Sequence, residues 1–369
     1  MARSQMTTSD NLRKEAWEEE LFRDTVVNSY FLSKFAGNAT SNFVEKGAKF
    51  ESAPENVIQV KTNLEMKGKT KTRDGDKITF GLVPRIDPNT NAGVTSGQTL
   101  KGREVALSWY NYSLELERYR QAVSAGGHMD WQRASFDMPV ESRSALLTWG
   151  SEKMDLLCFQ ALEASPSNIL YKTSDTGPVL AKTGTLATAK TALTAADSKI
   201  TPAFLDYVAT WARTGGGRAS AVPIRPIMVD GKPYYVYLTH PDAAFDWGNN
   251  STAMQAMREA EVRGKENPIF SGASYVWKGV IIHTHEFVTV GEDAGAGSDV
   301  AYTYGHLLGA QALCWAWGER PSVVEDTEDY EEDLFYAWRM TGKVGSPKFN
   351  SQTYGSLATL ISRTNISGL

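Results

Sequence analysis

The chain has little cysteine and no apolar run long enough to cross a membrane. Its 369 residues include two cysteines, Cys158 and Cys314, each inside an apolar segment. Two such residues do not form the disulfide framework of a small secreted domain, so both are predicted to be buried free thiols. No apolar run approaches the roughly 20 residues that a membrane-spanning helix needs. These absences favour a soluble protein made in a reducing compartment.

Excess positive charge is also absent. The formal net charge is −5 at pH 7, whereas proteins that bind nucleic acid strongly carry a basic face. Hydrophobic residues make up 41% of the chain and charged residues 22%, which is typical of a folded globular protein and not of a disordered one. General binding to nucleic acid is therefore not expected.

Recognisable catalytic motifs are missing as well. No Gly-x-Ser-x-Gly nucleophile elbow occurs, and neither cysteine lies where its thiolate would be activated. The run Gly215–Arg218 lacks the Lys-Ser/Thr ending of a phosphate-binding loop, so it is interpreted as a turn. The sequence predicts no catalytic residue and no cofactor.

One motif does contain the residue types of a metal site, His283-Thr284-His285-Glu286. On a strand His283 and His285 point to one face, and His306 or His240 could supply a third ligand. The competing interpretation, two polar residues on the exposed face of a strand, is favoured because no third ligand or supporting carboxylate is fixed by the sequence. A metal-dependent enzyme using His283 and His285 is kept as an alternative from a different functional class.

What the chain does have is a long excursion with no evident core, beginning at Asn56. Val57–Thr62 and Lys77–Leu82 have strand composition, and the Asp-Gly pair between them is typical of a hairpin. A third extended run, Glu104–Tyr119, changes the parity of its apolar residues near Asn111, which requires a bulge. A hairpin with so few bulky apolar residues needs a neighbour to be stable, and a second copy of the chain is the expected neighbour.

Other elements follow from apolar periodicity and from helix start and stop signals. Helices are predicted over residues 9–36, 139–164, 202–213, 243–263 and 304–317. Strands are predicted over residues 224–229, 234–238, 275–290, 334–338 and 354–361. Residues 165–199 are rich in Ala, Thr, Lys and Ser and are interpreted as a surface insertion. The predicted fold class is α+β.

The tip of the excursion is basic. Residues 67–77 hold four lysines and one arginine against two aspartates, a local charge of +3 in a chain of −5. Its contact residues are predicted to be Lys67, Lys69, Lys71, Arg73 and Lys77. An acidic partner surface is expected, and the candidates are Glu18, Glu19 and Glu20 or the run Glu325–Asp333.

The order of these elements resembles the tailed-phage major capsid fold of the Hong Kong 97 type, and several stretches resemble the N4-type family of phage major capsid proteins. They are spread over most of the chain in the family's order, and it is the ordered set that carries the resemblance. They comprise Asn56–Thr62, Gly75–Phe80, Gly93–Thr95 with Leu100–Gly102, Met129–Arg133, Gly305–Ala312, and Lys348–Asn350 with Tyr354–Gly355.

The resemblance implies a shell protein that assembles into pentamers and hexamers around double-stranded DNA without sequence-specific binding, with a virion location after synthesis in the bacterial cytoplasm. It implies an N-terminal arm (1–55), an extended loop (56–115), a peripheral domain with a spine helix (116–200), an axial domain (201–324) and strands returning to the peripheral domain (325–369). Scaffolding, portal and decoration proteins are conceivable partners. A bacterial nanocompartment shell, which shares the fold but encloses an enzyme, is an alternative.

Overall fold

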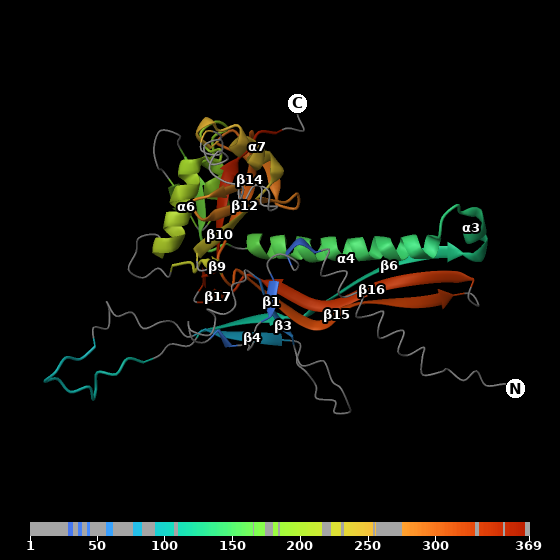
Figure 1. The fold of residues 1–369 in the computed structure, drawn as a ribbon, viewed down its shortest axis with the longest axis horizontal. Coiled ribbons are helices and arrows are strands. Elements are labelled where there is room, and N and C mark those ends of the chain that lie inside the picture. Colours follow the sequence, from blue (N-terminus) through green and yellow to red (C-terminus); the bar gives the residue numbers. More distant parts are fainter. Residues whose placement is uncertain are drawn as a thin grey trace.

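Two β-sheets and one long helix organise the molecule (Figure 1). A computed structural model describes residues 29–31, 36–38, 43–44, 57–61, 77–82, 93–106, 110–164, 166–173, 180–183, 185–215, 223–229, 232–253, 255, 275–328, 332–349 and 351–365. Within this part of the chain the mixture of helices and strands confirms the predicted α+β class.

The first sheet is elongated and has five strands in the order β1-β3-β15-β16-β6. These span Ala36–Asn38, Val57–Lys61, Leu313–Glu328, Asp333–Gly345 and Glu117–Gly127 respectively. The long hairpin β15–β16 forms its centre, and β6 pairs antiparallel with β16 along one edge. Beside it lies a three-stranded sheet of β2, β4 and β5, which span Phe43–Val44, Lys77–Leu82 and Tyr110–Glu115.

The helix α4, Met138–Glu163, lies along the five-stranded sheet (Figure 1). The Asp137 carboxylate accepts the Val140 N–H at its N-terminus, and a proline lies in the first turn, where its missing N–H costs nothing. The sheet-facing side includes Leu146 and Met154, packed with Trp338 and Met340 of β16. Its 26 residues would extend about 39 Å at about 1.5 Å each, so the predicted spine helix is confirmed.

The second sheet has nine strands and is buried on both faces. Its main path is β11-β12-β10-β14-β19-β7-β8, spanning Tyr275–Trp277, Val280–Thr284, Lys232–Thr239, Val300–Leu308, Ser356–Ser362, Ile169–Lys172 and Leu180–Thr183. Two further strands pair with it, β9 (Ile227–Val229) with β10 and β13 (Val290–Ala294) with β14. Alternate residues of β10 show the two faces: Tyr235 and Tyr237 join one apolar cluster and Val236 and Leu238 the other.

Short helices complete the described structure. The helix α6, Pro202–Thr214, starts at Thr201 and ends at Gly215, which has the left-handed conformation usual for a helix stop. The helix α7, Pro241–Gly248, begins two residues before the predicted 243–263 helix, and residues 251–253 and 255 are also helical, whereas residues 256–263 lie outside the described part of the chain. The others are α3 (His128–Arg133) and α5 (Leu186–Thr191), and β17 (Lys348–Phe349) pairs with β18 (Gln352–Thr353). No helix among the described residues is long and apolar enough to cross a membrane.

The predicted hairpin is wrong in its pairing, although both strands exist. The strand β3 pairs in parallel with β1 and β15, whereas β4 pairs antiparallel with β5 in a separate sheet. The Asp-Gly signal at residues 74–75 lies outside the described residues. The three-stranded sheet also has a small core, because Ile78 and Leu114 pack with Cys314 and Ala316 of β15. Strand composition identifies strands, but a long-range neighbour decides their pairing.

No bulge lies at Asn111 within β5, where Asn111 pairs with Gly81 in a regular register, and residues 107–109 before it lie outside the described residues. A break in the third run does lie at Leu116. This residue separates β5 from β6, and the chain passes there from the three-stranded sheet into the five-stranded one. The expected function of the break, a transfer between two sheets, is therefore present at a different residue.

The predicted buried helix over 304–317 is also wrong. Its residues form the end of β14, a turn, and the start of β15, and all of them are buried except Gln311, which is half-buried. A continuous apolar run is compatible with a buried helix or with a strand covered on both faces. Gly305 favours the strand because a Cβ there would collide with the Tyr237 hydroxyl and Thr359 Oγ1, and Gln311 adopts a φ of 63° in the turn.

Residues 165–199 are not a surface insertion. They contain β7, whose four residues are all buried, and β7 pairs in parallel with β19 in the nine-stranded sheet. Sheet membership consequently crosses the expected boundaries at 200 and 324: β7, β8 and β19 join the sheet of the 201–324 region, and β15 joins the sheet of β6 and β16. Most of the predicted 9–36 helix lies outside the described residues, and Ala36 is in a strand.

Candidate assembly surfaces

One end of the elongated sheet, named here the distal end, exposes large apolar side chains. It comprises α3, residues 134–143 at the start of α4, and the strand ends 325–328 and 332–333 (Figure 1). Met129, Phe136 and Val140 are 57%, 59% and 60% exposed. Their neighbours are acidic, with exposed carboxylates at Asp130, Asp137, Glu141, Glu325, Asp326, Glu328 and Glu332. An apolar surface with a charged rim is typical of a protein contact.

A loop, residues 93–106, projects at the opposite end (Figure 1). It is held by its own hydrogen bonds: Gln98 N–H donates to Thr95 O at 3.1 Å, and the Arg103 guanidinium donates to Gln98 Oε1 at 2.8 Å. Leu100 is 62% exposed and Val105 is 45% exposed. A loop with internal order and uncovered apolar residues is prepared for a contact at little further entropic cost.

The chain before β1 is attached to the spine helix by one buried carboxylate. Asp155 of α4, 4% exposed, accepts hydrogen bonds from Ser29 Oγ at 2.8 Å, Tyr30 N at 2.8 Å and Phe31 N at 3.0 Å. The Phe31 ring is fully buried and packs edge-on against Phe159, with ring centres 4.9 Å apart. We call this cluster the arm clasp.

The two histidines of the metal-like motif belong to the arm clasp. The His285 ring lies 4.7 Å from the Tyr30 ring and 5.0 Å from the Phe159 ring, and its Nδ1 accepts the Phe287 N–H at 3.1 Å. The centre of the His283 ring lies 6.3 Å from the centre of the Tyr30 ring. Both are half-buried, so the expectation that they occupy an exposed strand face is wrong. His283 lies in β12 as predicted, whereas His285 follows the last residue of that strand, Thr284.

The other two histidines proposed as third ligands have partners of their own. His306 Nε2 lies 3.4 Å from Glu163 Oε1, and His240 Nδ1 lies 3.5 Å from Asp242. Among the described residues no three His, Cys, Asp or Glu side chains are grouped as a metal site requires. The described geometry therefore gives the metal hypothesis no ligand set.

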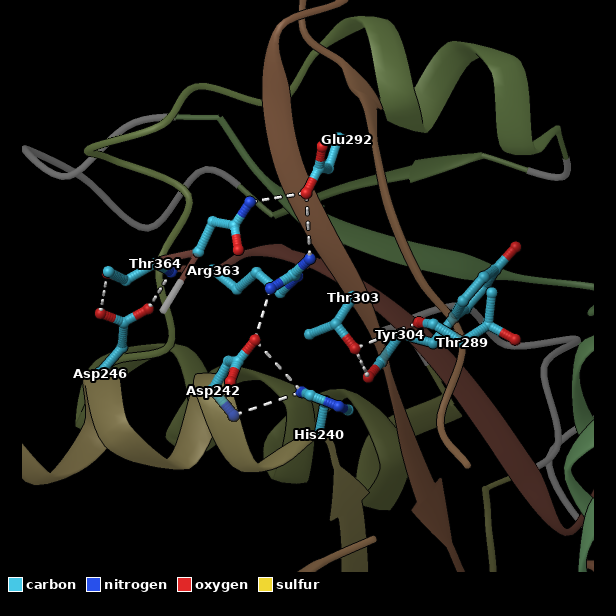
Figure 2. A network of polar contacts seen from close by, with 10 residues as sticks. His240, Asp242, Asp246, Thr289, Glu292, Thr303, Tyr304, Arg363 and Thr364 are labelled. Carbon is cyan, nitrogen blue, oxygen red and sulfur yellow. Dashed lines mark hydrogen bonds and ion pairs between the residues drawn. The ribbon is translucent and has the colours of Figure 1, made fainter. Parts of the chain in front are cut away.

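A polar network fixes the end of β19 against α7 and β13 (Figure 2). The Arg363 guanidinium, 6% exposed at its side chain, pairs with Asp242 and lies 3.8 Å from Glu292. Asp246 accepts hydrogen bonds from Thr364 N and Oγ1 at 2.8 and 2.6 Å and pairs with Lys199. Burial lowers the pKa of His240, and the Arg363 charge acts in the same direction, whereas Asp242 and Glu286 oppose it.

A second polar contact joins the spine helix to the nine-stranded sheet. Glu163, the last residue of α4, accepts hydrogen bonds from Thr289 N and Oγ1 and contacts the buried His306. The His306 ring stacks on Tyr304, whose hydroxyl pKa is raised by burial and then by Glu163. Both polar sites organise structure, since neither borders an open site with a nucleophile and a base.

The sequence-predicted contact residues are only partly described. Lys77 lies in β4, and its Nζ is 3.6 Å from Glu115 of β5, so one of the five cations has an intrachain partner. Lys67, Lys69, Lys71, Arg73 and the Glu18–Glu20 run lie outside the described residues. Glu325, Asp326 and Glu328 end β15 and are exposed, as a partner surface for a second copy requires. Cys158 and Cys314 are free and buried, as predicted.

Sequence reasoning missed Asp155 and Arg363. An acidic residue at one position of an apolar helical stripe was the available signal for Asp155, since carboxylates are rarely buried without partners. Arg363 had no comparable signal, because its partners lie in α7 and β13, far away in sequence.

A model of a family described as "Phage capsid protein" matches residues 6–351. The chain belongs to this phage capsid protein family. The major capsid protein of Pseudomonas phage KPP25 is 25% identical over 353 residues, covering 87% of this chain and 85% of that protein. A capsid protein has a structural function in the virion shell, so the expectation of a non-enzyme agrees with the family.

Solved phage capsids share the fold. The capsid protein of Ralstonia phage GP4 superposes with a TM-score of 0.71 at 22% identity, with 92% of each chain covered. That of cyanophage Pam1 gives 0.66 at 18% identity, covering 98% of this capsid protein and 99% of the other. These likenesses confirm the predicted Hong Kong 97-type capsid fold, and the chain is a major capsid protein of a phage shell.

Proposed function

We propose that this capsid protein associates with copies of itself into pentamers and hexamers that close into an icosahedral shell around double-stranded DNA. The observation that supports this most directly is the shape of the described chain. The distal end and the 93–106 loop lie at opposite ends, and both expose large apolar side chains that nothing in the described part of the chain covers. Contacts between copies would bury these surfaces.

We also propose the regional assignment that the resemblance implies, adjusted to the sheets. The five-stranded sheet with α4 serves as the peripheral domain, and the nine-stranded sheet with α6 and α7 serves as the axial domain around the capsomer centre. Residues 1–55 serve as the N-terminal arm and residues 56–115 as the extended loop. Among phage capsid proteins we place the chain in the N4-type group, on the stretches quoted above, and scaffolding, portal and decoration proteins remain conceivable partners.

The proposed relation to DNA is containment without sequence recognition. A net charge of −5 suits an inner wall that does not hold the genome tightly, because strong pairing with phosphates would resist both packaging and release.

Expression of the chain alone, followed by sedimentation and electron microscopy, tests self-assembly. We expect fast-sedimenting capsomers or closed particles. A folded chain that remains monomeric at micromolar concentration, with and without scaffolding protein from the same phage, would contradict the proposal.

A further inference from the structure

The end of the spine helix meets the nine-stranded sheet at one junction. Figure 1 shows α4 ending beside that sheet, and Phe159 and Leu162 of α4 belong to the same apolar cluster as Leu238 of β10 and Tyr304 of β14. Apolar contacts have no preferred direction, whereas hydrogen bonds require a particular distance and angle. The polar contacts at this junction therefore distinguish one angle between the two bodies, the five-stranded sheet with α4 and the nine-stranded sheet, from another.

Residues 285–289, the connection between β12 and β13, supply polar contacts of this kind. Thr289 N and Oγ1 donate hydrogen bonds to the Glu163 carboxylate at the end of α4, at 3.3 and 2.5 Å. The connection itself is fixed to the nine-stranded sheet, because His285 N donates to Thr239 O at 3.0 Å. It thus reports the position of that sheet to the spine helix.

The arm clasp spans the same junction. Asp155 of α4 holds the backbone of residues 29–31, while the Tyr30 ring lies 4.7 Å from the His285 ring, measured between ring centres. The Phe159 ring of α4 lies 5.0 Å from the same His285 ring. A short segment near the start of the chain therefore contacts both the spine helix and the connection that Glu163 holds.

The chain crossing between β14 and β15, residues 309–312, is a sharp turn. Gly309 N donates to Gly355 O and Ala310 N donates to Arg225 O, both at 2.8 Å. Gln311 has a φ of 63°, which is uncommon for a residue other than glycine. Sparsely populated backbone conformations occur in switch regions, and hinges are a few residues that absorb a change of direction. Rotation of the two bodies would need to change only a few backbone angles here.

We propose that the arm clasp controls the angle between the five-stranded sheet with α4 and the nine-stranded sheet. With residues 29–31 docked, the connection 285–289 is supported by the arm and stays against Glu163. With residues 29–31 displaced, that support is lost and the two bodies pivot at the 309–312 crossing. A contact on the chain before residue 29 is thereby transmitted to the shape of the capsid subunit. This inference concerns the single subunit and goes beyond the proposed shell function.

Thermodynamic linkage makes such a coupling reciprocal. If docking of residues 29–31 favours the contact between Glu163 and Thr289, breaking that contact must loosen residues 29–31 by the same factor. A clasp that only anchors the arm has no such effect, because the two sets of hydrogen bonds share no residue.

Amide hydrogen exchange in the full-length chain tests the coupling in both directions. Phe31→Ala removes a fully buried ring of the arm clasp, and it should speed exchange of the Thr289 amide by about tenfold through local opening. Glu163→Ala should speed exchange of the Tyr30 and Phe31 amides by a similar factor. Phe31→Leu keeps an apolar side chain and should give a smaller rise at Thr289, so it serves if Phe31→Ala does not fold.

Two matched controls change the same residue types elsewhere. Phe136→Ala alters an exposed ring at the distal end, and Glu152→Ala alters an exposed position of α4. Both should leave exchange of the Thr289 amide and of residues 29–31 unchanged. Exchange within β10 should stay slow in every variant, which separates a local opening from loss of the fold.

A distance between spin labels measures the angle itself. Labels at Ser124→Cys in β6 and Lys232→Cys in β10 lie on the two bodies at exposed positions, and the native cysteines are buried. With a large excess of unlabelled chain, the otherwise unmodified protein should give one narrow distance distribution. Phe31→Ala should broaden or shift that distribution.

An unchanged label distance in Phe31→Ala, together with unchanged exchange at Thr289, would overturn the proposal. Unchanged exchange of residues 29–31 in Glu163→Ala would overturn it as well, because the coupling has to act in both directions. None of these results depends on whether particles form, so they are independent of the test of self-assembly.

Discussion

Single buried charges hold the ends of this chain in place. Asp155 receives three hydrogen bonds from residues 29–31, and Arg363 joins the end of β19 to α7. A buried charge that loses its partners is costly because the lost hydration is no longer offset. The capsid protein therefore depends on a few residues to fix segments that have little core of their own.

Replacing Asp155 should release the arm clasp. Asp155→Ala leaves the Tyr30 and Phe31 N–H groups without this acceptor, and we expect a loss of roughly 2–4 kcal/mol in the free energy of unfolding. Urea unfolding measures this, and limited proteolysis should show faster cleavage before residue 36. Asp155→Asn keeps one acceptor oxygen and should lose less, and Gln160→Ala, an exposed site on the same helix, should change little. Equal stability of Asp155→Ala and Gln160→Ala would refute the clasp.

The histidines of the clasp give a related expectation. His285→Ala removes a ring that contacts Tyr30, Phe159 and Phe287, so it should lower stability by about 1–2 kcal/mol, mainly through lost packing. This replaces the sequence-based expectation that both histidines are neutral surface positions. Addition and chelation of zinc should leave the unfolding midpoint unchanged, and a zinc-dependent midpoint would revive the metal hypothesis.

Acid should weaken the network at the end of β19. The pKa of His240 is lowered in the folded chain, mainly by burial, while the unfolded value is about 6.5. The unfolded chain thus takes up the proton first as the pH falls. The stabilisation is fully present above pH 6.5 and is lost as the pH falls through the folded pKa. His240→Asn, which retains a helix-capping acceptor, should lose less stability between pH 7.5 and 5.5. Identical pH slopes for the two proteins would contradict this.

Among the elements, the long helix α4 packs so closely against the sheet beneath it that Gly150 has no room for a side chain. A Cβ on Gly150 would lie 2.7 Å from Trp338 Nε1 and 2.9 Å from Cε2. Alanine normally favours a helix over glycine by about 1 kcal/mol. At this position we expect the reverse: Gly150→Ala should lower the free energy of unfolding by roughly 1–3 kcal/mol, because the added methyl group overpacks the contact with Trp338.

Thermal unfolding of Gly150→Ala beside Ser144→Ala, at an exposed position of the same helix, checks this. The first should lower the midpoint and the second should leave it unchanged or raise it slightly. A higher midpoint for Gly150→Ala would show that Trp338 moves aside at no cost.

Local signals in the sequence predicted the helices and strands better than they predicted which strands pair with each other. Pro139, Thr201 and Gly215 mark helix ends, and the helices over 138–163 and 202–214 were predicted almost to the residue. The strands β3 and β4 were recognised by composition, but their partners β15 and β5 follow from contacts distant in sequence, which no local pattern encodes. The apolar run from 304 to 317 was taken for a helix because burial on both faces removes the alternation that identifies a strand.

The same limit applies to the site residues. Charge runs were the basis for predicting contact segments, and the acidic strand end at residues 325–328 is exposed, as a contact segment must be. The apolar residues between those charges, Phe136 and Val140, could not be distinguished from core residues, because exposure depends on where α3 and the start of α4 lie. The prediction of an assembling protein came instead from the excursion that begins at Asn56, whose described strands pair within the chain, and the fold supplied the exposed surfaces.

At the scale of the whole molecule, the described part of the capsid protein is an elongated unit that exposes large apolar side chains at both ends (Figure 1). As a monomer the protein keeps these apolar surfaces exposed to water. Association gains free energy because neighbouring copies bury them. The fold therefore places at the two ends the apolar side chains that assembly would bury.

A density map of particles formed by the recombinant chain, at a resolution that traces the main chain, tests the central claim most directly. We predict closed icosahedral particles built from pentamers and hexamers, in which neighbouring copies cover the 93–106 loop and the distal end of each subunit. Particles that leave both surfaces in solvent would contradict their proposed function as assembly contacts, and the absence of closed particles under all conditions tested would contradict the shell itself.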